Sequence, residues 1–273
     1  MSQERNLWLR RFHSVEHGEG PAEDPASELI CFPHAGGSAA YWRGLAVELA
    51  PLVDVLAVQY PGRLDRLHEA PVEDLHRLAD LVVAELGPPG DRPRALLGHS
   101  MGASLAYEVA VRLTRVPGGR PDLLVLSCRR APDAARRRPQ DWPRDDAELI
   151  ARVRTLGGTD SALLDDPELL DVILPALRGD YRALASYEPT PGRTLSCPVV
   201  ALTGDRDAEV PVEDLRGWRG CTSGDFRTRV FEGGHFFLND HVGEVAELIR
   251  GMLPASAGRA WRPAAGAVAP IGE

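Results

Sequence analysis

The 273-residue sequence contains no lysine, so all 31 of its basic residues are arginines. This absence excludes any mechanism that needs a lysine base or a lysine Schiff base. The sequence also lacks a run of about 18 apolar residues, the minimum for a membrane-spanning helix. Its four cysteines are widely spaced and form no CxxC pair. This spacing favours buried free thiols over a zinc site or a disulfide framework.

Positive charge is scarce as well, because 40 acidic residues leave a formal net charge of −9. An acidic chain repels the phosphates of nucleic acids and the surface of anionic membranes, so neither is an expected partner. The first 17 residues carry charges throughout and lack the apolar centre of a signal peptide. With 44% hydrophobic residues, the chain is long enough for one large α/β domain. We expect that domain to be soluble and cytoplasmic.

Short apolar runs alternate with longer amphipathic stretches, which is typical of a mostly parallel sheet flanked by helices. The predicted strands are residues 28–32, 53–58, 94–97, 123–127, 199–202 and 227–231. The predicted helices are residues 39–49, 72–86, 101–113, 212–218 and 242–252. The sequence therefore predicts the α/β class.

The alternation breaks between residues 129 and 190, where two helical patterns, 145–156 and 167–187, occur without a convincing strand. We expect this insertion to form a helical lid on a core made of residues 1–128 and 191–253. Pro175 should kink or split the second helix, because proline lacks the backbone N–H and clashes with the preceding turn. Residues 254–273 are rich in alanine, glycine and proline, and are predicted to be a disordered tail.

A candidate nucleophile lies in the motif Gly98-His99-Ser100-Met101-Gly102, which follows a predicted strand and opens a predicted helix. A G-x-S-x-G motif in this context is typical of the α/β-hydrolase fold, in which a sharp turn raises the serine above the sheet. The glycines allow strand and helix to approach closely, and the helix dipole favours negative charge at Ser100. The motif alone also fits a glycine-rich helix entry capped by serine, but its context favours the nucleophile.

A serine nucleophile needs an imidazole to accept its proton, and in this fold the chain order is serine, acid, histidine. Only His235 and His241 follow Ser100. His235 follows a predicted strand and a Gly233-Gly234 turn, whereas His241 begins the last helix and is interpreted as a solvated surface residue. We therefore predict His235 as the base.

The acid should lie on the loop after the strand at residues 199–202, which carries Asp205 and Asp207. The spacing does not decide between them, because one aspartate of such a turn commonly binds a backbone N–H. We take Asp207 as catalytic and Asp205 as the residue that forms the turn. Asp225 and Asp240 are weaker candidates, because they flank the base rather than follow the strand.

Ester or thioester cleavage passes through an oxyanion that needs two fixed N–H donors. The residue after the nucleophile supplies one, so Met101 is the first predicted donor. The loop Phe32-Pro33-His34-Ala35-Gly36-Gly37-Ser38 should supply the other, and its position points to the N–H of Ala35. A plain glycine turn with Ser38 as helix cap is the alternative interpretation of this loop.

The ordered motifs together resemble the type II, or editing, thioesterases of polyketide and nonribosomal peptide synthesis. The segments that carry the resemblance are FPHAGGS at 32–38, YPGR at 60–63, GHSMGA at 98–103, RAP at 130–132, TGDRD at 203–207 and GGHFF at 233–237. The similarity covers residues 8–252. It implies an α/β-hydrolase fold with Ser100, Asp207 and His235 as the triad, Ala35 and Met101 as oxyanion amides, and the insertion as a lid. Cys128 departs from the family, which more often has glycine there.

The resemblance further implies the substrate, an acyl group on the phosphopantetheine arm of an acyl or peptidyl carrier protein. Hydrolysis through an acyl-serine would clear stalled or mis-primed carriers and would need no cofactor and no metal. Carrier proteins are typically acidic, so docking needs a local basic face. Arg136, Arg137 and Arg138 are predicted to help dock the carrier; a solvated surface loop is the other interpretation of this run.

Two other functions fit parts of the pattern. A carboxylesterase or lipase that acts on small oxyesters would use the same triad, because the leaving group and pocket are not visible in the sequence. A catalytically dead hydrolase fold could serve as a binding module. The presence of serine, aspartate and histidine in the expected order disfavours this last interpretation.

Overall fold

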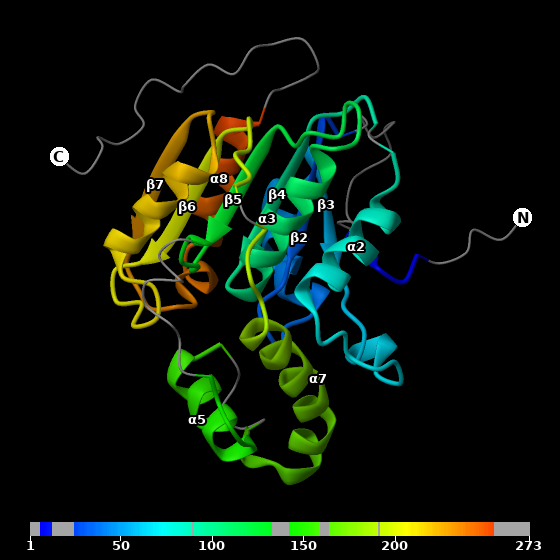
Figure 1. Cartoon of the computed structure of the whole chain (residues 1–273), viewed down its shortest axis with the longest axis vertical. Coiled ribbons are helices and arrows are strands. Elements are labelled where there is room, and N and C mark those ends of the chain that lie inside the picture. The colour runs from blue at the N-terminus through cyan, green and yellow to red at the C-terminus, as the bar shows by residue number, and fades with distance from the viewer. Residues whose placement is uncertain are drawn as a thin grey trace, which may run out of the picture.

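The computed structural model describes residues 6–12, 25–88, 90–132, 142–158, 164–190 and 192–253. Its centre is a seven-stranded sheet in the order β1-β3-β2-β4-β5-β6-β7 (Figure 1). Strand β1 is antiparallel to β3, and all other neighbours are parallel. The strands are β1 (Leu9–Arg11), β2 (Ser27–Phe32), β3 (Val53–Val58), β4 (Arg94–His99), β5 (Leu123–Ser127), β6 (Val199–Gly204) and β7 (Phe226–Phe231).

The six predicted strands are confirmed, and four of them extend one or two residues beyond the predicted bounds. All residues of β2, β4, β5 and β6 are buried, because helices cover both faces of the sheet. The sequence analysis missed β1. Its three residues contain two arginines, so neither an apolar run nor a period of two marks it.

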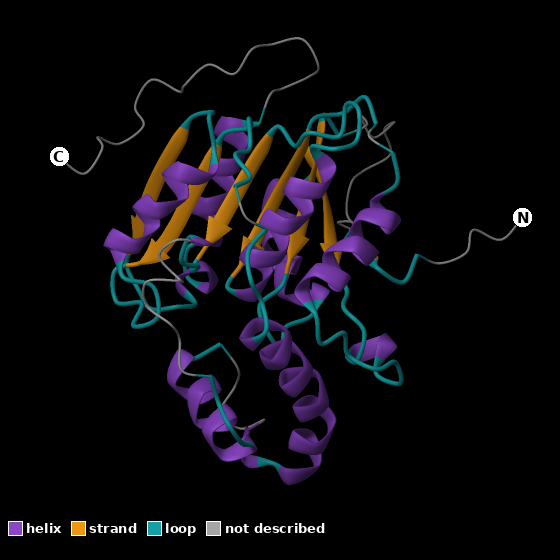
Figure 2. Cartoon of the chain, in the orientation of Figure 1, coloured by secondary structure: helices purple, strands orange, loops and turns teal. Residues whose placement is uncertain are grey.

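Helices pack on both faces of the sheet (Figure 2). On one face, α2 (Leu75–Leu86), α3 (Met101–Leu113) and the 3-10 helix η3 (Val212–Cys221) share one hydrophobic cluster. On the other face, α1 (Arg43–Leu49) and α8 (Val242–Met252) share a second. Short 3-10 helices complete the core: η1 (Ala39–Trp42), η2 (Leu64–Arg66) and η4 (Phe237–Asn239).

Two predicted helices differ in kind from the expectation. The segment 39–49 divides into η1 and α1, and the segment 212–218 forms the 3-10 helix η3, which reaches Cys221. Periodic burial of apolar side chains does not distinguish 3.0 from 3.6 residues per turn over segments this short. In η3 the pattern buries only Leu215 and Trp218, which are three residues apart.

Helices α5 (Asp146–Leu156) and α7 (Pro167–Ala185) lie beyond the carboxyl ends of the strands (Figure 2). They pack against each other through a separate cluster that includes Leu149, Leu174 and Leu177. This is where the sequence predicts the lid. The remaining predicted features, the arginine run 136–138 and the tail 254–273, fall outside the described residues.

Of the two effects predicted for Pro175, a kink or a split, the split does not occur, because α7 is continuous from Pro167 to Ala185. Pro175 is exposed, as is Asp171, the residue whose carbonyl loses its partner, so water can satisfy that carbonyl. The next turn is held by the buried Leu174 and Leu177. Among the helices described, none is long and apolar enough to cross a membrane.

Candidate active site

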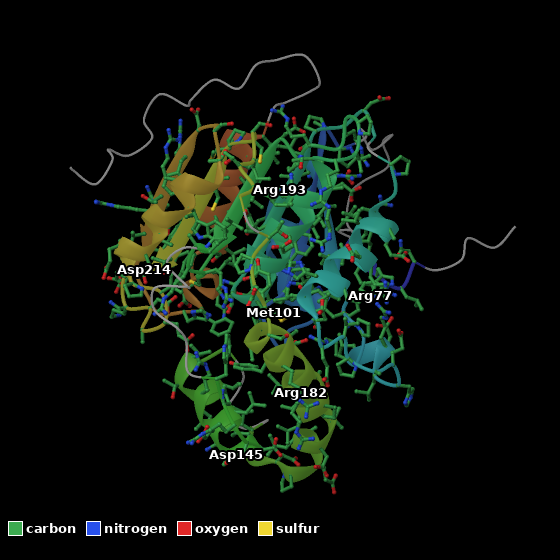
Figure 3. The ribbon with its side chains drawn as sticks, viewed as in Figure 1. Arg77, Met101, Asp145, Arg182, Arg193 and Asp214 are labelled. Carbon is green, nitrogen blue, oxygen red and sulfur yellow. The ribbon has the colours of Figure 1, made fainter. Side chains whose placement is uncertain are left out.

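Ser100 occupies the sharp turn between β4 and α3. Its φ of 54° and ψ of −116° lie in a region that side-chain-bearing residues rarely adopt. A Cβ on Gly98 would come within 2.1 Å of the Gly102 oxygen, and a Cβ on Gly102 within 2.0 Å of the Phe32 oxygen. Both glycines are therefore required by close backbone packing. Figure 3 shows Met101, the first residue of α3, at the level where the sheet meets α7.

Ser100, His235 and Asp207 form a chain of hydrogen bonds. The Oγ of Ser100 is 2.9 Å from Nε2 of His235, and Nδ1 of His235 is 2.9 Å from Oδ2 of Asp207. A carboxylate can only accept, so Nδ1 carries the proton and Nε2 accepts from the serine hydroxyl. This tautomer is the one that a general base needs.

Asp207 is fixed by its own turn. Its Oδ1 accepts from the N–H groups of Glu209 at 2.9 Å and Val210 at 3.2 Å. Burial raises the pKa of Asp207, but hydrogen bonding and charge from His235 and the Glu209 N–H outweigh burial, so its pKa lies below the usual value. Asp205 instead accepts from the N–H of Gly233 at 2.8 Å, which fits the turn-forming role predicted for it.

The other downstream histidine lies outside this chain of bonds. His241 binds Glu244 through Nδ1 at 2.6 Å and the Glu232 carbonyl through Nε2 at 2.9 Å. These contacts account for both of its ring nitrogens at the surface of the molecule. The structure thus brings His235, and not His241, to Ser100.

Cys128 lies beside the histidine and the aspartate. Its Sγ donates to the His235 carbonyl at 3.0 Å, and burial raises the pKa of the thiol well above its ordinary value. Ligand atoms of Cys128, Asp207 and His235 lie within 4.8 Å of one another, a set that could hold a metal ion. However, both ring nitrogens of His235 already bind Ser100 and Asp207. A metal ion would have to break one of those bonds, so the arrangement fits proton transfer better.

Cys128 has a φ of 51°, a left-handed conformation that glycine adopts without cost. The resemblance to type II thioesterases led us to expect glycine at this position. The left-handed backbone agrees with that expectation, since any side chain here is strained.

The two predicted oxyanion amides belong to residues close to Ser100. The N–H of Met101 is in the first turn of α3, where helical geometry leaves N–H groups unpaired. Ala35 and Ser100 line the same small cavity, together with His34 and His235. Neither N–H has a hydrogen-bond acceptor among the described residues.

Two further imidazoles surround the base. The rings of His99 and His235 are 5.4 Å apart, and those of His34 and His99 are 6.0 Å apart. Burial, followed by the charges of His235 and Arg63, lowers the pKa of His34 to about 3. Burial, followed by His235 and His34, holds the pKa of His99 well below its usual value. Both rings are therefore neutral beside the base.

An ion pair that the sequence did not reveal supports the loop that carries Ala35. Asp180 of α7 accepts from Arg63 at 2.7 and 2.9 Å and from the Gly36 N–H at 2.7 Å. Arg63 also donates to the Gly37 carbonyl at 3.1 Å. The YPGR motif marked Arg63, but its partner is 117 residues away and carries no local signal.

Ser100 opens onto a cavity of about 500 Å³. His235 also lines this cavity, as do the aromatic side chains of Trp142, Tyr187 and Trp218. The cavity is large enough for a small ligand or for part of a longer chain. The smaller cavity beside Ala35 measures about 20 Å³, roughly the space of one water molecule.

Comparison with known proteins gives a consistent result. Residues 27–253 match the thioesterase domain family. The chain is 45% identical over 248 residues to the probable cadicidin biosynthesis thioesterase of Streptomyces griseus, covering 90% of this chain and 66% of that protein. It is 44% identical over 259 residues to the thioesterase PikA5 of Streptomyces venezuelae, covering 94% and 89%.

A solved structure extends the comparison to the fold. The type II thioesterase BorB from the borrelidin biosynthetic cluster superposes with a TM-score of 0.78 and 42% identity. The match covers 91% of this chain and 98% of the BorB chain.

Proposed function

The chain belongs to the thioesterase family, as a type II thioesterase, and on this premise we propose that it hydrolyses acyl thioesters carried on the phosphopantetheine arm of acyl or peptidyl carrier proteins. The biological task would be the editing of polyketide or nonribosomal peptide synthases, by removal of stalled or mis-primed acyl groups. The relatives named for biosynthetic pathways support this substrate class. The four free cysteines support action in a reducing compartment such as the cytoplasm.

The observation that carries the proposal is the hydrogen-bond chain from Ser100 through His235 to Asp207, in which Ser100 and His235 line the large cavity. In the first step, Ser100 Oγ attacks the thioester carbonyl while His235 takes the hydroxyl proton. Asp207 stabilises the imidazolium that forms. Its low pKa keeps the carboxylate ionised at neutral pH.

Collapse of the tetrahedral intermediate breaks the C–S bond, and His235 returns the proton to the departing thiol. A water molecule then loses a proton to His235 and attacks the acyl-serine. The second tetrahedral intermediate releases the carboxylic acid and restores Ser100. In both steps the Ala35 and Met101 amides would donate to the oxyanion, and their lack of acceptors among the described residues supports this role.

Two parts of the proposal concern access to the site. We take α5 and α7, within the segment 129–190, as the lid over the cavity, because Trp142 and Leu184 line it from this segment.

Arg136, Arg137 and Arg138 remain the proposed docking residues, and they lie outside the described residues. Charge reversal there should weaken hydrolysis of a carrier-bound acyl group and spare a small soluble thioester. Equal effects on both substrates would count against docking.

The test of the function uses a purified carrier protein loaded with a panel of acyl groups. The protein should release the acyl acids, and Ser100→Ala should lower turnover by on the order of 10⁴-fold or more. A matched pair of thioester and oxyester substrates separates thioesterase from carboxylesterase activity. Near-normal turnover by Ser100→Ala, or failure of a fluorophosphonate probe to label Ser100, would overturn the assignment.

A further inference from the structure

Arg129 lines the same cavity as Ser100 and has no role in the proposed chemistry. It follows β5, whose last residue, Ser127, accepts a hydrogen bond from the Ser100 N–H at 2.8 Å. The Arg129 carbonyl accepts from Nε1 of Trp218 at 2.8 Å, and the preceding Cys128 is bound to the His235 carbonyl. These hydrogen bonds therefore fix the backbone of Arg129 close to Ser100.

The guanidinium of Arg129 makes no hydrogen bond and no ion pair with any residue that the structure describes. Other arginines near Arg129 do have carboxylate partners. The neighbouring Arg130 pairs with Asp214 at 3.2 Å, and Arg152 pairs with Glu209 at 2.6 Å. The buried arginines of the core also have carboxylate partners; they are Arg63 with Asp180, Arg66 with Glu69 and Arg94 with Glu28.

The surroundings make this unpaired charge costly. Burial lowers the pKa of Arg129; the nearby Tyr187 and Glu209 raise it in part, and Arg130 and Arg152 lower it further. Glu209, the acid whose charge acts on Arg129, already pairs with Arg152. Glu188, which also lines the cavity, is exposed to solvent. A partly buried guanidinium whose N–H donors and charge have no partner among the described residues is a preformed site for an anion.

We infer that Arg129 forms an anion-binding subsite within the substrate cavity and holds a phosphate or carboxylate oxygen of the thioester substrate. This inference rests on the proposed function and adds a charge requirement to it. A carrier-bound substrate offers two sources of such oxygens. One is the phosphate of the phosphopantetheine arm, and the other is a carboxylate on the acyl chain. Both present the paired oxygens that a guanidinium binds with two hydrogen bonds.

Matched substrates separate the two sources. Butyryl-pantetheine and butyryl-4′-phosphopantetheine differ only in the phosphate. Butyryl-pantetheine and succinyl-pantetheine differ only in the terminal carboxylate. For each pair, the measured quantity is the ratio of kcat/KM for the anionic substrate to that for the neutral one. Arg129→Gln should lower at least one ratio roughly tenfold or more, because a charge-assisted hydrogen bond is lost.

Arg77→Gln is the matched control, since it removes the same charge from the exposed face of α2, on the opposite side of the view from Asp214 (Figure 3). It should leave both ratios unchanged. Arg129→Met, which keeps much of the side chain's length, repeats the test if Arg129→Gln does not fold. The affected ratio identifies the anion as phosphate or carboxylate.

Binding measurements keep the test independent of turnover. Dissociation constants of 4′-phosphopantetheine and pantetheine are measured on the otherwise unchanged protein, and those of succinyl- and butyryl-pantetheine on Ser100→Ala. The preference for the anionic member of a pair should fall when Arg129 is also replaced. Unchanged ratios and unchanged binding preferences in both Arg129 variants would overturn the inference, whereas absence of any thioester hydrolysis by the native protein would instead overturn the proposed function.

Discussion

Asp180 of α7 and Arg63, which follows β3, form a buried bidentate ion pair, and both side chains also bind the loop carrying the proposed oxyanion amide. Side chains of both residues are less than 10% exposed. The same carboxylate accepts from the Gly36 N–H, and a Cβ on Gly36 would come within 2.5 Å of Leu177. The second half of α7 is thus fixed to this loop, so motion of α7 as part of the proposed lid would also move the loop.

Asp180→Asn should therefore impair both stability and turnover. It leaves the charge of Arg63 buried without a counterion, which costs about 3–5 kcal/mol in similar pairs. It also weakens the bond to the Gly36 N–H, next to the Ala35 amide, and should lower kcat by about tenfold with a smaller effect on KM. Urea unfolding and steady-state kinetics measure the two effects.

The control for this variant is Asp146→Asn, which removes an ion pair between α5 and Arg178 of α7, at 2.7 Å but exposed to solvent. Its melting temperature and kcat should stay near those of the native protein. A boronic acid that mimics the tetrahedral intermediate gives a further readout. If Asp180→Asn binds this inhibitor as tightly as the native protein does, the loop does not depend on the ion pair.

The two aspartates of the loop after β6 should respond differently to replacement. Asp207→Asn disrupts the acceptor for Nδ1 of His235 and should lower kcat by roughly 10⁴-fold, as expected when the imidazole loses its required tautomer. Asp205→Asn keeps an oxygen that can accept from the Gly233 N–H, so its loss should be small. Kinetics on one soluble thioester compares the variants, and a larger loss for Asp205→Asn would reverse the two roles.

The sequence was informative wherever a local pattern determines the structure. Buried parallel strands are apolar on both faces, so their runs were visible, and the order of the motifs placed Ser100 and His235. Spacing alone did not separate Asp205 from Asp207, because both have the same chemistry two residues apart. The resemblance favoured Asp207, and the structure places Asp207 against His235. Pairs such as Arg63 and Asp180 form only through folding, over 117 residues, and a single sequence carries no record of them.

The surroundings of Pro175 and Arg129 could not be predicted from the sequence either. The exposed position of Pro175 could not be deduced from its presence in a helical pattern, and the helix continued through it. Whether the Arg129 guanidinium binds any of the described residues depends on where the nearby carboxylates point. These are properties of the packed molecule rather than of residue types.

The buried imidazoles should make stability fall on mild acidification. His34 and His99 are neutral when folded, because their pKa values are lowered, but they bind protons near pH 6.5 when unfolded. Below about pH 6.5 the unfolded state therefore binds more protons. For each ring, the free energy of unfolding then falls by up to about 1.4 kcal/mol for each pH unit of acidification. Glu244 raises the pKa of the exposed His241, which acts in the opposite direction and offsets a small part of the loss.

Urea unfolding between pH 7.5 and 5.5 measures how steeply the free energy of unfolding changes with pH, before most carboxylates titrate. We call this change the slope. His99→Gln should reduce the slope by about one proton, and His241→Gln should make it slightly steeper. A slope that does not change in His99→Gln would show that this ring is protonated, or exposed, in the folded protein.

Cys128 offers a test of backbone strain that is separate from its thiol. Both Cys128→Ala and Cys128→Gly remove the Sγ contact with the His235 carbonyl, but only glycine relieves the φ of 51°. The glycine variant should be more stable than the alanine variant by about 1 kcal/mol, measured by urea unfolding. Cys197 is the matched control, since it is also buried but is not among the described residues with positive φ. There the order should reverse, with alanine more stable by roughly 0.5–1 kcal/mol, because glycine gains chain entropy when unfolded. The same order at both positions would mean that the strain at Cys128 does not contribute to stability.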